Sequence, residues 1–209
     1  MSRWEKLRAS ATRMRKVEPV EQSRKLLNIA LVGFMGTGKT SVGHVLASIL
    51  RFRFIDTDDL IEARARRRIA AIFAEEGEER FREYERQVVE DLQRFRRTVL
   101  ATGGGLAANA ANMASLKTHS FVVCLWASPE AIFERVRHQS HRPLLHTPNP
   151  LARIRSLFAD RARSYREADV LVNTERRNIR EVALQAAHHF RLAHRPAPSR
   201  EDRHSTKSA

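Results

Sequence analysis

The chain contains, at residues 33–40, the sequence Gly33-Phe34-Met35-Gly36-Thr37-Gly38-Lys39-Thr40. It fits the pattern G-x-x-x-x-G-K-[ST], which is the phosphate-binding loop called Walker A. In such a loop the glycines let the backbone wrap closely around an anion, and successive N–H groups point inward at the start of the following helix. We expect the Lys39 ammonium to contact the β- and γ-phosphates of a nucleotide and the Thr40 hydroxyl to bind Mg²⁺.

The residues on either side of this loop have the pattern that a phosphate loop requires. Residues 26–32 are mostly apolar and are predicted to form a buried strand. Residues 39–50 have the periodicity of an amphipathic helix, with one face formed by Val42, Val45, Leu46, Ile49 and Leu50. The alternative is a glycine-rich turn that matches by chance, and the presence of strand, loop and helix in the right order disfavours it.

Length, composition and charge limit the class of protein. The 209 residues, 42% of them apolar, are enough for one domain with a core and two tails. The net charge of +14 raises nucleic acid as a partner. The charge is concentrated at the ends, however: residues 1–25 carry eight Lys or Arg against three acids, and residues 191–209 carry five against two. Subtracting +5 and +3 leaves +6 for residues 26–190, so nucleic acid is not the expected partner.

These tails and the cysteine count define the expected organisation. Residues 1–25 are predicted to be a basic extension, disordered or partly helical, residues 26–192 the folded domain, and residues 193–209 a disordered basic tail. Cys124 is the only cysteine, which excludes a disulfide framework and suits a reducing cytosol. No apolar run reaches 18 residues, and the N-terminus lacks the apolar core of a secretory signal. We therefore expect a cytoplasmic protein without a membrane segment.

Strand-like and helix-like segments alternate through the rest of the chain. This alternation predicts a three-layer α/β fold, with a parallel sheet and helices on both sides. The polar, proline-rich residues 138–150 predict a mobile lid between two helices. The further predicted strands are 53–56, 98–101, 121–126 and 169–173, and the predicted helices lie within 57–96, near 109–116, at 129–137 after the capping residue Ser128, at 151–167 and at 180–192.

Two polar or glycine-rich stretches follow predicted strands. Asp56-Thr57-Asp58-Asp59 follows the second strand, and Gly103-Gly104-Gly105 follows the third. The carboxyl ends of strands are where ligands bind in open α/β sheets, so the carboxylates are candidate ligand-binding groups. The three glycines form either a flexible turn or a place where the backbone approaches a ligand closely.

A set of short motifs, in a fixed order, resembles the shikimate kinase family over about residues 27–190. The motifs that carry the resemblance are Phe54-Ile55-Asp56-Thr57-Asp58, Ile61-Glu62, Gly77-Glu78-Glu79-Arg80-Phe81-Arg82-Glu83-Tyr84-Glu85, Gly103-Gly104-Gly105, Arg142-Pro143-Leu144-Leu145, and Arg161 with Tyr165. The resemblance implies transfer of the ATP γ-phosphate to the 3-hydroxyl of shikimate, in aromatic amino-acid biosynthesis. It also implies a nucleoside monophosphate kinase-like fold with strand order 2-3-1-4-5 and a helical substrate-binding segment at about residues 57–96. A monomer is expected.

On the substrate side, the resemblance implies a role for each matching residue. Arg82 and Arg161 match the arginines that hold the shikimate carboxylate, and a guanidinium fork suits a planar carboxylate. Asp58 matches the carboxylate that orients the attacking hydroxyl and accepts its proton, or only hydrogen-bonds it. Asp56 matches the group that supports Mg²⁺ beside Thr40. The other matching positions are Glu85, which anchors the arginines, the backbone wall Gly103, Gly104 and Gly105, and the apolar walls Phe73 and Phe81.

On the ATP side, the resemblance extends the phosphate loop by three arginines. Arg142 matches the lid arginine that neutralises charge on the transferring phosphate. Arg135 and Arg177 match positions that sandwich adenine, where a flat guanidinium stacks on a ring. The implied catalytic residues are thus Lys39, Asp58 and Arg142, and the loop residues expected around ATP are Gly36, Thr37, Gly38, Lys39, Thr40 and Ser41.

Three other functions are alternatives to an active shikimate kinase. A related kinase for another small acid, such as gluconate, would share the phosphate loop and a carboxylate-binding arginine. A sensor that binds shikimate without turnover predicts the loss of Lys39, Thr40, Asp58 or Arg142, and all four are present. A nucleic-acid-binding protein predicts a basic stripe with interleaved aromatic residues, but the chain has only two Tyr and two Trp.

Overall fold

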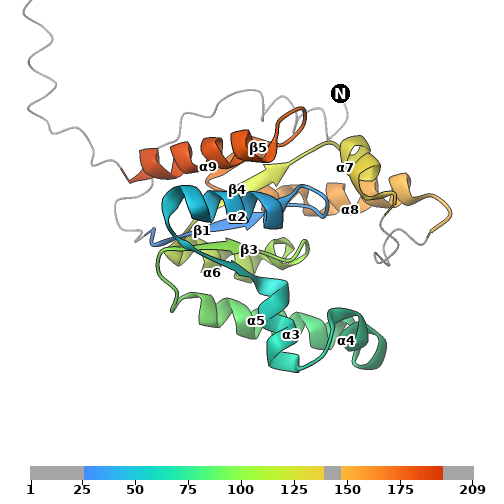
Figure 1. Ribbon diagram of the computed structural model, residues 1–209. Coiled ribbons are helices and arrows are strands. Elements are labelled where there is room, and N and C mark those ends of the chain that lie inside the picture. The colour runs from blue at the N-terminus through green and yellow to red at the C-terminus, as the bar shows by residue number, and fades with distance from the viewer. Residues whose placement is uncertain (1–25, 139–146, 195–209) are drawn as a thin grey trace, which may run out of the picture.

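The computed structural model describes residues 26–138 and 147–194. The predictions for the two tails, for most of the lid and for Arg142 lie outside these residues. The described part is an α/β fold with a five-stranded sheet in the order β2-β3-β1-β4-β5, and each neighbouring pair is parallel. The fold class and the strand order 2-3-1-4-5 are therefore confirmed (Figure 1). The strands are β1 Asn28–Val32, β2 Arg53–Asp56, β3 Thr98–Ala101, β4 Ser120–Trp126 and β5 Val170–Asn173.

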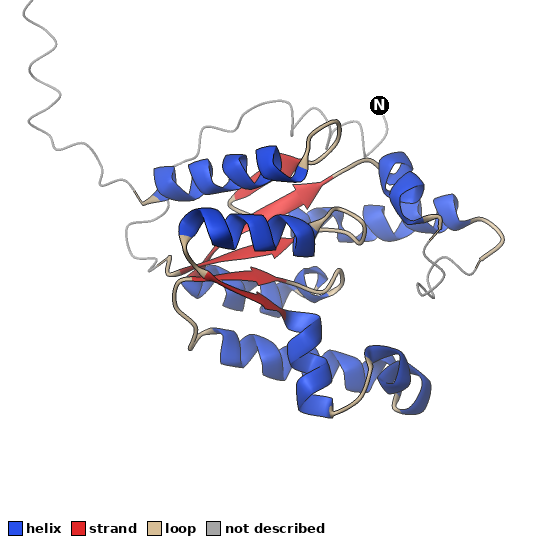
Figure 2. Ribbon diagram, viewed as in Figure 1, coloured by secondary structure: helices blue, strands red, loops and turns tan. Residues whose placement is uncertain are grey.

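Helices cover both faces of this sheet (Figure 2). Successive strand residues point to opposite faces, so Ala30 and Val122 belong to one buried cluster, whereas Ile29 and Val123 belong to the other. The first cluster includes residues of α5, α6, α7 and α8, and the second includes residues of α2 and α9. The helices are α2 Lys39–Leu50, α3 Thr57–Ala65, α4 Ile69–Glu75, α5 Gly77–Leu92, α6 Ala110–His119, α7 Pro129–Val136, α8 Pro150–Tyr165 and α9 Ile179–Ala193.

Local sequence signals explain where several helices begin. The Ser128 hydroxyl accepts the Ala131 N–H at 3.2 Å, and Pro129 occupies the first turn of α7, where its missing N–H costs nothing. A reciprocal capping box between Asn178 and Glu181 starts α9. One short element, the 3₁₀ turn η1 Leu106–Ala108, was not predicted, because three residues give no periodicity.

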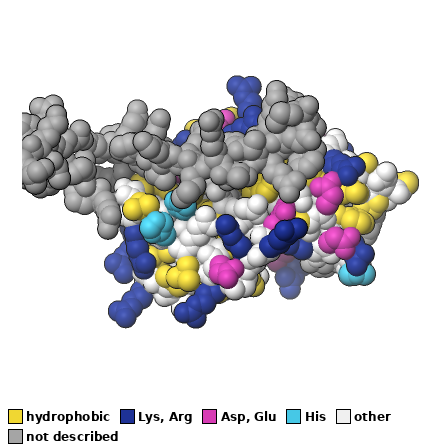
Figure 3. All heavy atoms as spheres, turned by 90° about the horizontal axis from the view of Figure 1, so that it is seen from above, with side chains coloured by type: hydrophobic (Ala, Val, Ile, Leu, Met, Phe, Trp, Pro, Cys, Tyr) yellow, Lys and Arg dark blue, Asp and Glu magenta, His cyan; other side chains and the backbone are white. Residues whose placement is uncertain are grey.

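Element ends differ from the predictions by a few residues. β1 begins at Asn28 rather than at residue 26, and within the predicted helical segment 57–96 the longest helix, α5, occupies Gly77–Leu92. Gly77 has a φ of +83° and opens α5, so this glycine separates α4 from α5. The space-filling view from above shows Lys and Arg side chains interspersed with Asp and Glu (Figure 3). Among the described residues, no helix is both long and apolar enough to cross a membrane.

Candidate functional site

The phosphate loop connects the end of β1 to the start of α2, and close packing explains its glycines. Gly33 has a φ of +135°, and a Cβ there would lie 2.3 Å from the carbonyl oxygen of Leu125. Gly36, at φ +74°, would place a Cβ 2.7 Å from Val136 Cγ1. Neither position has room for a side chain, so the loop can follow this path only with glycine at both.

Lys39 lies over the same loop. Its ammonium donates hydrogen bonds to the carbonyl oxygens of Gly33 and Phe34, both at 3.0 Å. The Thr37 hydroxyl donates to the Phe34 carbonyl at 2.8 Å and thereby closes the turn. The Lys39 charge and the N-terminus of α2 thus lie next to the same loop, and this arrangement favours the binding of a phosphate.

Two oxygen-bearing side chains meet beside the loop, at the ends of β2 and the start of α2. The Thr40 hydroxyl donates to Asp56 Oδ2 at 2.9 Å. The other oxygen, Asp56 Oδ1, accepts the backbone N–H of Asp58 at 3.1 Å and so caps α3. A hydroxyl and a carboxylate are ligands that Mg²⁺ prefers, with water and phosphate oxygens completing its octahedron. Within the described residues, no cluster of three or more His, Cys, Asp or Glu offers a larger metal cage.

Asp58 is the most perturbed carboxylate near the loop. Burial, followed by the negative charge of Asp56, raises its pKa from 3.8 to about 6, although the Lys39 charge opposes the rise. Its Oδ1 atom is buried and has no hydrogen-bond partner among the described residues. A Cβ on Gly103 would lie 2.6 Å from this oxygen. Asp58 therefore presents an unpaired oxygen toward the glycine stretch, at a pKa suited to taking up a proton near neutral pH.

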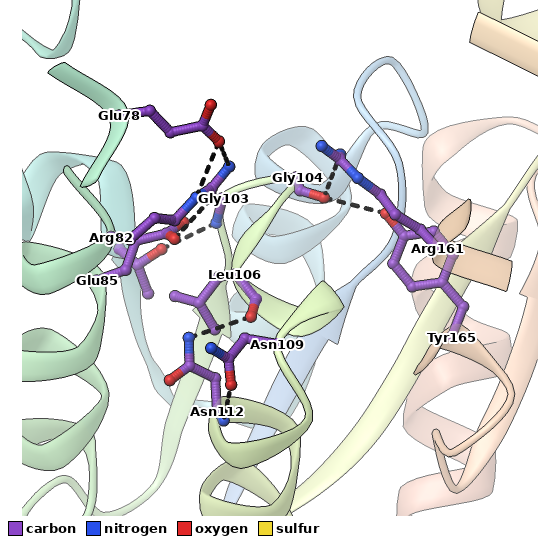
Figure 4. Close-up of polar contacts among 11 residues, drawn as sticks. Glu78, Arg82, Glu85, Gly103, Gly104, Leu106, Asn109, Asn112, Arg161 and Tyr165 are labelled. Carbon is purple, nitrogen blue, oxygen red and sulfur yellow. Dashed lines mark hydrogen bonds and ion pairs between the residues drawn. The ribbon is translucent and has the colours of Figure 1, made fainter. Parts of the chain in front are cut away.

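The glycine stretch after β3 is held from both sides. The Gly103 N–H donates to the Thr57 hydroxyl at 2.9 Å. The Gly104 carbonyl accepts hydrogen bonds from Arg161 at 2.9 Å and from the Tyr165 hydroxyl at 3.0 Å. Side chains from α3 and α8 thus hold the backbone in place, so this stretch is not a flexible turn. The close-up shows the contacts of Gly104 with Arg161 and Tyr165 (Figure 4).

Arg82 projects from α5 on the other side of this stretch, as the close-up shows (Figure 4). It forms ion pairs with Glu78 at 2.7 Å and with Glu85 at 2.6 Å. Burial alone would lower the Arg82 pKa, but the bonds to Glu85 and Glu78 raise it overall. Burial raises the pKa of Glu85, and its bond to Arg82 opposes that rise. The guanidinium is therefore charged and held in one orientation, close enough to Gly105 that a Cβ there would lie 2.6 Å from it.

Aromatic rings border the two arginines. The Arg161 guanidinium lies 5.4 Å from the centroid of the Phe34 ring, and Arg82 lies 5.4 Å from that of Phe81. Phe81 is buried, and its ring stacks at 4.7 Å on Phe73, which is 41% exposed. Both predicted wall residues thus lie together, one of them open to solvent.

The two arginines expected around adenine converge on the residues where β5 ends. Arg135 donates to the Thr174 carbonyl at 2.8 Å, to the Thr174 hydroxyl at 2.9 Å and to the Gly36 carbonyl at 3.3 Å. Arg177 donates to the Asn173 carbonyl at 3.2 Å and is also bonded to Gln185. The bond to Gly36 joins Arg135 directly to the phosphate loop.

Several residues that hold the site in place were not predicted to have a role. These are Thr57, Glu78, Tyr165 and Thr174. Glu78 had a signal, because it lies four residues before Arg82 on a helix, where opposite charges meet. The partners of Gly103 and Arg135 are distant in sequence, so no local pattern could have revealed them.

Comparison with known proteins identifies the family of this chain. The family model described as "Shikimate kinase" matches residues 35–191. The chain belongs to the shikimate kinase family. The shikimate kinase of Thermodesulfovibrio yellowstonii is 44% identical over 156 residues, which are 75% of this chain and 90% of that protein.

Solved structures agree with this assignment. The structure titled as shikimate kinase from Acinetobacter baumannii in complex with shikimate has a TM-score of 0.77 and 36% identity, covering 83% of this chain and 97% of that one. A gluconokinase from Sinorhizobium meliloti has a TM-score of 0.53 at 20% identity, covering 81% of this chain and 95% of that one. The second likeness shows a shared fold alone.

Proposed function

We propose that this shikimate kinase family member transfers the γ-phosphoryl group of ATP to the 3-hydroxyl of shikimate, in aromatic amino-acid biosynthesis. The products are shikimate 3-phosphate and ADP. The observation that supports the assignment is Asp58, a carboxylate with a pKa of about 6 that feels the Lys39 charge and faces Gly103. Its buried Oδ1 has no hydrogen-bond partner in the part of the chain that the structure describes. The family match makes shikimate, rather than gluconate, the acceptor that we propose.

Asp58 is proposed to orient the attacking hydroxyl and to accept its proton as the O–P bond forms. Its pKa leaves it mostly ionised at neutral pH, so that it can accept a proton, while burial keeps it basic enough to do so. The Gly103 position explains why the hydroxyl can come close, because any side chain there would contact Asp58 Oδ1.

Arg82 and Arg161 are proposed to bind the shikimate carboxylate from opposite sides of the glycine stretch (Figure 4). The ion pairs of Arg82 and the Gly104 bond of Arg161 orient the two guanidinium groups before substrate arrives. Such preorganisation reduces the entropy lost on binding. Glu85 is proposed to position Arg82, and Phe73 and Phe81 to line the apolar side of the bound ring.

For the nucleotide, we propose that residues Gly36 to Ser41 enclose the phosphates and that Lys39 contacts the transferring group. Thr40 and Asp56 would hold Mg²⁺, directly or through water, and the ion would supply neutralising charge to the phosphate oxygens. The proposed roles of Arg135 and Arg177 are contacts with adenine. Arg142, outside the described residues, is proposed to stabilise charge on the transferring phosphate.

Coupled ADP release tests this proposal. Mg-ATP is supplied with shikimate, gluconate or quinate at equal concentration, and shikimate alone is expected to support turnover. Turnover with gluconate instead would overturn the acceptor. Absence of turnover with any of them, while shikimate still raises the melting temperature, would indicate a sensor. We further propose that the protein is a cytoplasmic monomer, and light scattering after gel filtration checks its mass.

A further inference from the structure

An arginine-lined hollow lies at the end of the sheet opposite the phosphate loop. A pocket of about 530 Å³ is bordered by the turn between α2 and β2 and by the turn between α5 and β3. In Figure 1 these turns lie at the left, where β2 and β3 begin, whereas the phosphate loop and the glycine stretch lie at the right. Each strand has four residues, so about 13 Å of strand separates the two ends. The pocket is lined by Arg51, Phe52, Arg53, Arg94, Phe95, Arg96, Arg97 and Thr98.

Five of these eight residues are arginines, and none is acidic. Among the described residues, Arg94 is the only one of the five with an ion pair, which it forms at 3.4 Å with Asp91, and Asp91 also pairs with Arg64. Arg96 donates to the carbonyl oxygens of Gln93 and Phe95, which are neutral partners. Within residues 26–138 and 147–194, the positive charge of the pocket is thus only slightly offset by acidic side chains.

The remaining arginines are held by aromatic and backbone contacts. The Arg97 guanidinium lies 5.3 Å from the centroid of the Phe52 ring and donates to the Arg51 carbonyl at 3.5 Å. All five arginines are exposed, so water and salt screen their mutual repulsion, and a bound anion would reduce it further. The field also reaches into the core, because the Arg96 charge adds to burial in lowering the pKa of His119.

The backbone frame of the pocket is fixed rather than loose. Arg51 and Arg97 both have a φ of +53°, a left-handed conformation that ordinarily favours Gly or Asn. The Arg53 N–H donates to the Arg97 carbonyl, and the Arg97 N–H donates to the Leu27 carbonyl, both at 2.9 Å. The two turns are therefore joined to each other and to the residue before β1, which is the preorganisation that a binding site requires.

We propose that this pocket binds a small phosphorylated organic anion, at a site separate from the one that binds ATP and shikimate. Guanidinium forks bind phosphate oxygens bidentately, and several of them around one hollow suit a ligand with more than one phosphate. The volume lies in the range of small-molecule sites, and Phe52 and Phe95 give the pocket apolar walls. A pocket of this size suits a small ligand better than a nucleic acid, which needs an extended basic surface.

Binding is tested with fructose 1,6-bisphosphate as the probe and fructose as the uncharged control. The full chain, labelled with ¹⁵N and saturated with Mg-ADP to occupy the phosphate loop, is titrated and followed by amide chemical shifts. Saturable shifts are expected at residues 51–53 and 94–98, and none with fructose. Shifts confined to residues 33–40, or no shifts, would overturn the proposal.

Matched variants separate a specific site from general attraction to a basic protein. Arg51→Asn with Arg53→Gln removes two pocket charges, and Asn tolerates the left-handed backbone. The control pair, Arg66→Asn with Arg153→Gln, also removes two charges, and Arg66 has the same backbone conformation, at φ +52°. Calorimetry should show the bisphosphate affinity reduced about tenfold or more by the pocket pair and less than about twofold by the control.

Equal weakening by both pairs would overturn the proposal, because net charge would then explain it. Thermal unfolding establishes that each variant is folded. If the pocket pair unfolds, Arg53→Gln alone replaces it, since that exposed side chain lies on an edge strand. Tight binding of a 20-nucleotide poly-U RNA without binding of the bisphosphate would overturn the small-molecule assignment in favour of a nucleic acid.

Discussion

Replacing Asp58 by Asn should make the protein more stable at neutral pH while it removes most of the turnover. Asn keeps the shape of the side chain but carries no charge and accepts no proton. Loss of a general base typically lowers the rate about 10²- to 10⁴-fold. ATP binding should change far less, because the phosphate loop is untouched.

The gain in stability follows from the pKa of Asp58. A rise from 3.8 to about 6 on folding corresponds to about 3 kcal/mol, at 1.36 kcal/mol per pKa unit. The folded pKa is the higher one, so folding favours the protonated carboxyl group and disfavours the ionised one. The free energy of unfolding therefore falls as pH rises from 3.8 through about 6. The advantage of Asp58→Asn should therefore be below about 1 kcal/mol at pH 4 and about 3 kcal/mol at pH 7.5.

Urea unfolding at pH 4 and pH 7.5 measures this difference, and coupled ADP release measures turnover. The neighbouring exposed carboxylate provides the control, because Asp59→Asn should change neither quantity appreciably. In the wild-type protein, kcat/KM for shikimate should rise as pH passes about 6. An Asp58→Asn advantage that is the same at both pH values, or turnover within a few-fold of wild type, would refute the reasoning.

Three further substitutions test the contacts around the site and the fold. Gly105→Ala places a Cβ 2.6 Å from the Arg82 guanidinium, so the KM for shikimate should rise several-fold in steady-state kinetics while the melting temperature changes little. Tyr165→Phe removes the hydroxyl that donates to Gly104, and urea unfolding should show a loss of about 1 kcal/mol; no loss would mean that this bond does not hold the glycine stretch. Asn178→Ala removes the cap of α9 and should also cost about 1 kcal/mol, with kcat unchanged.

Most of the fold could be predicted because its signals are local. The apolar run before Gly33 and the helical period after Lys39 are short-range patterns, and α2 occupies the predicted residues 39–50. The order of the strands in the sheet, in contrast, could not be predicted from local signals. Alternating strands and helices indicate a parallel sheet, but which strands are neighbours depends on crossovers that no local pattern contains. That order came from the family resemblance, and the pairing of β1 with β3 and β4 confirms it.

The residues of the candidate site could be proposed from the sequence, but the electrostatics around them could not. The sequence placed Asp58 and Gly103 after different strands, and the sheet brings the two together because β2 and β3 are neighbours. The raised pKa of Asp58 arises from burial and from the charges of Asp56 and Glu85. These quantities depend on packing around the side chain, and a sequence gives no direct measure of packing.

The arginines show most clearly that the sequence does not reveal the surroundings of a side chain. The chain has 38 Lys and Arg residues, so that an arginine alone carries little information. Arg82 acquires meaning only from its two carboxylates, whose exposures differ greatly: the Glu85 side chain is 2% exposed and that of Glu78 is 66% exposed. An incoming carboxylate can replace Glu78 at little cost, since that group regains water. It cannot replace Glu85 without leaving a buried charge unpaired. The pair with Glu85 therefore fixes the orientation of Arg82, and the bond to Glu78 marks the direction from which the substrate carboxylate would be bound.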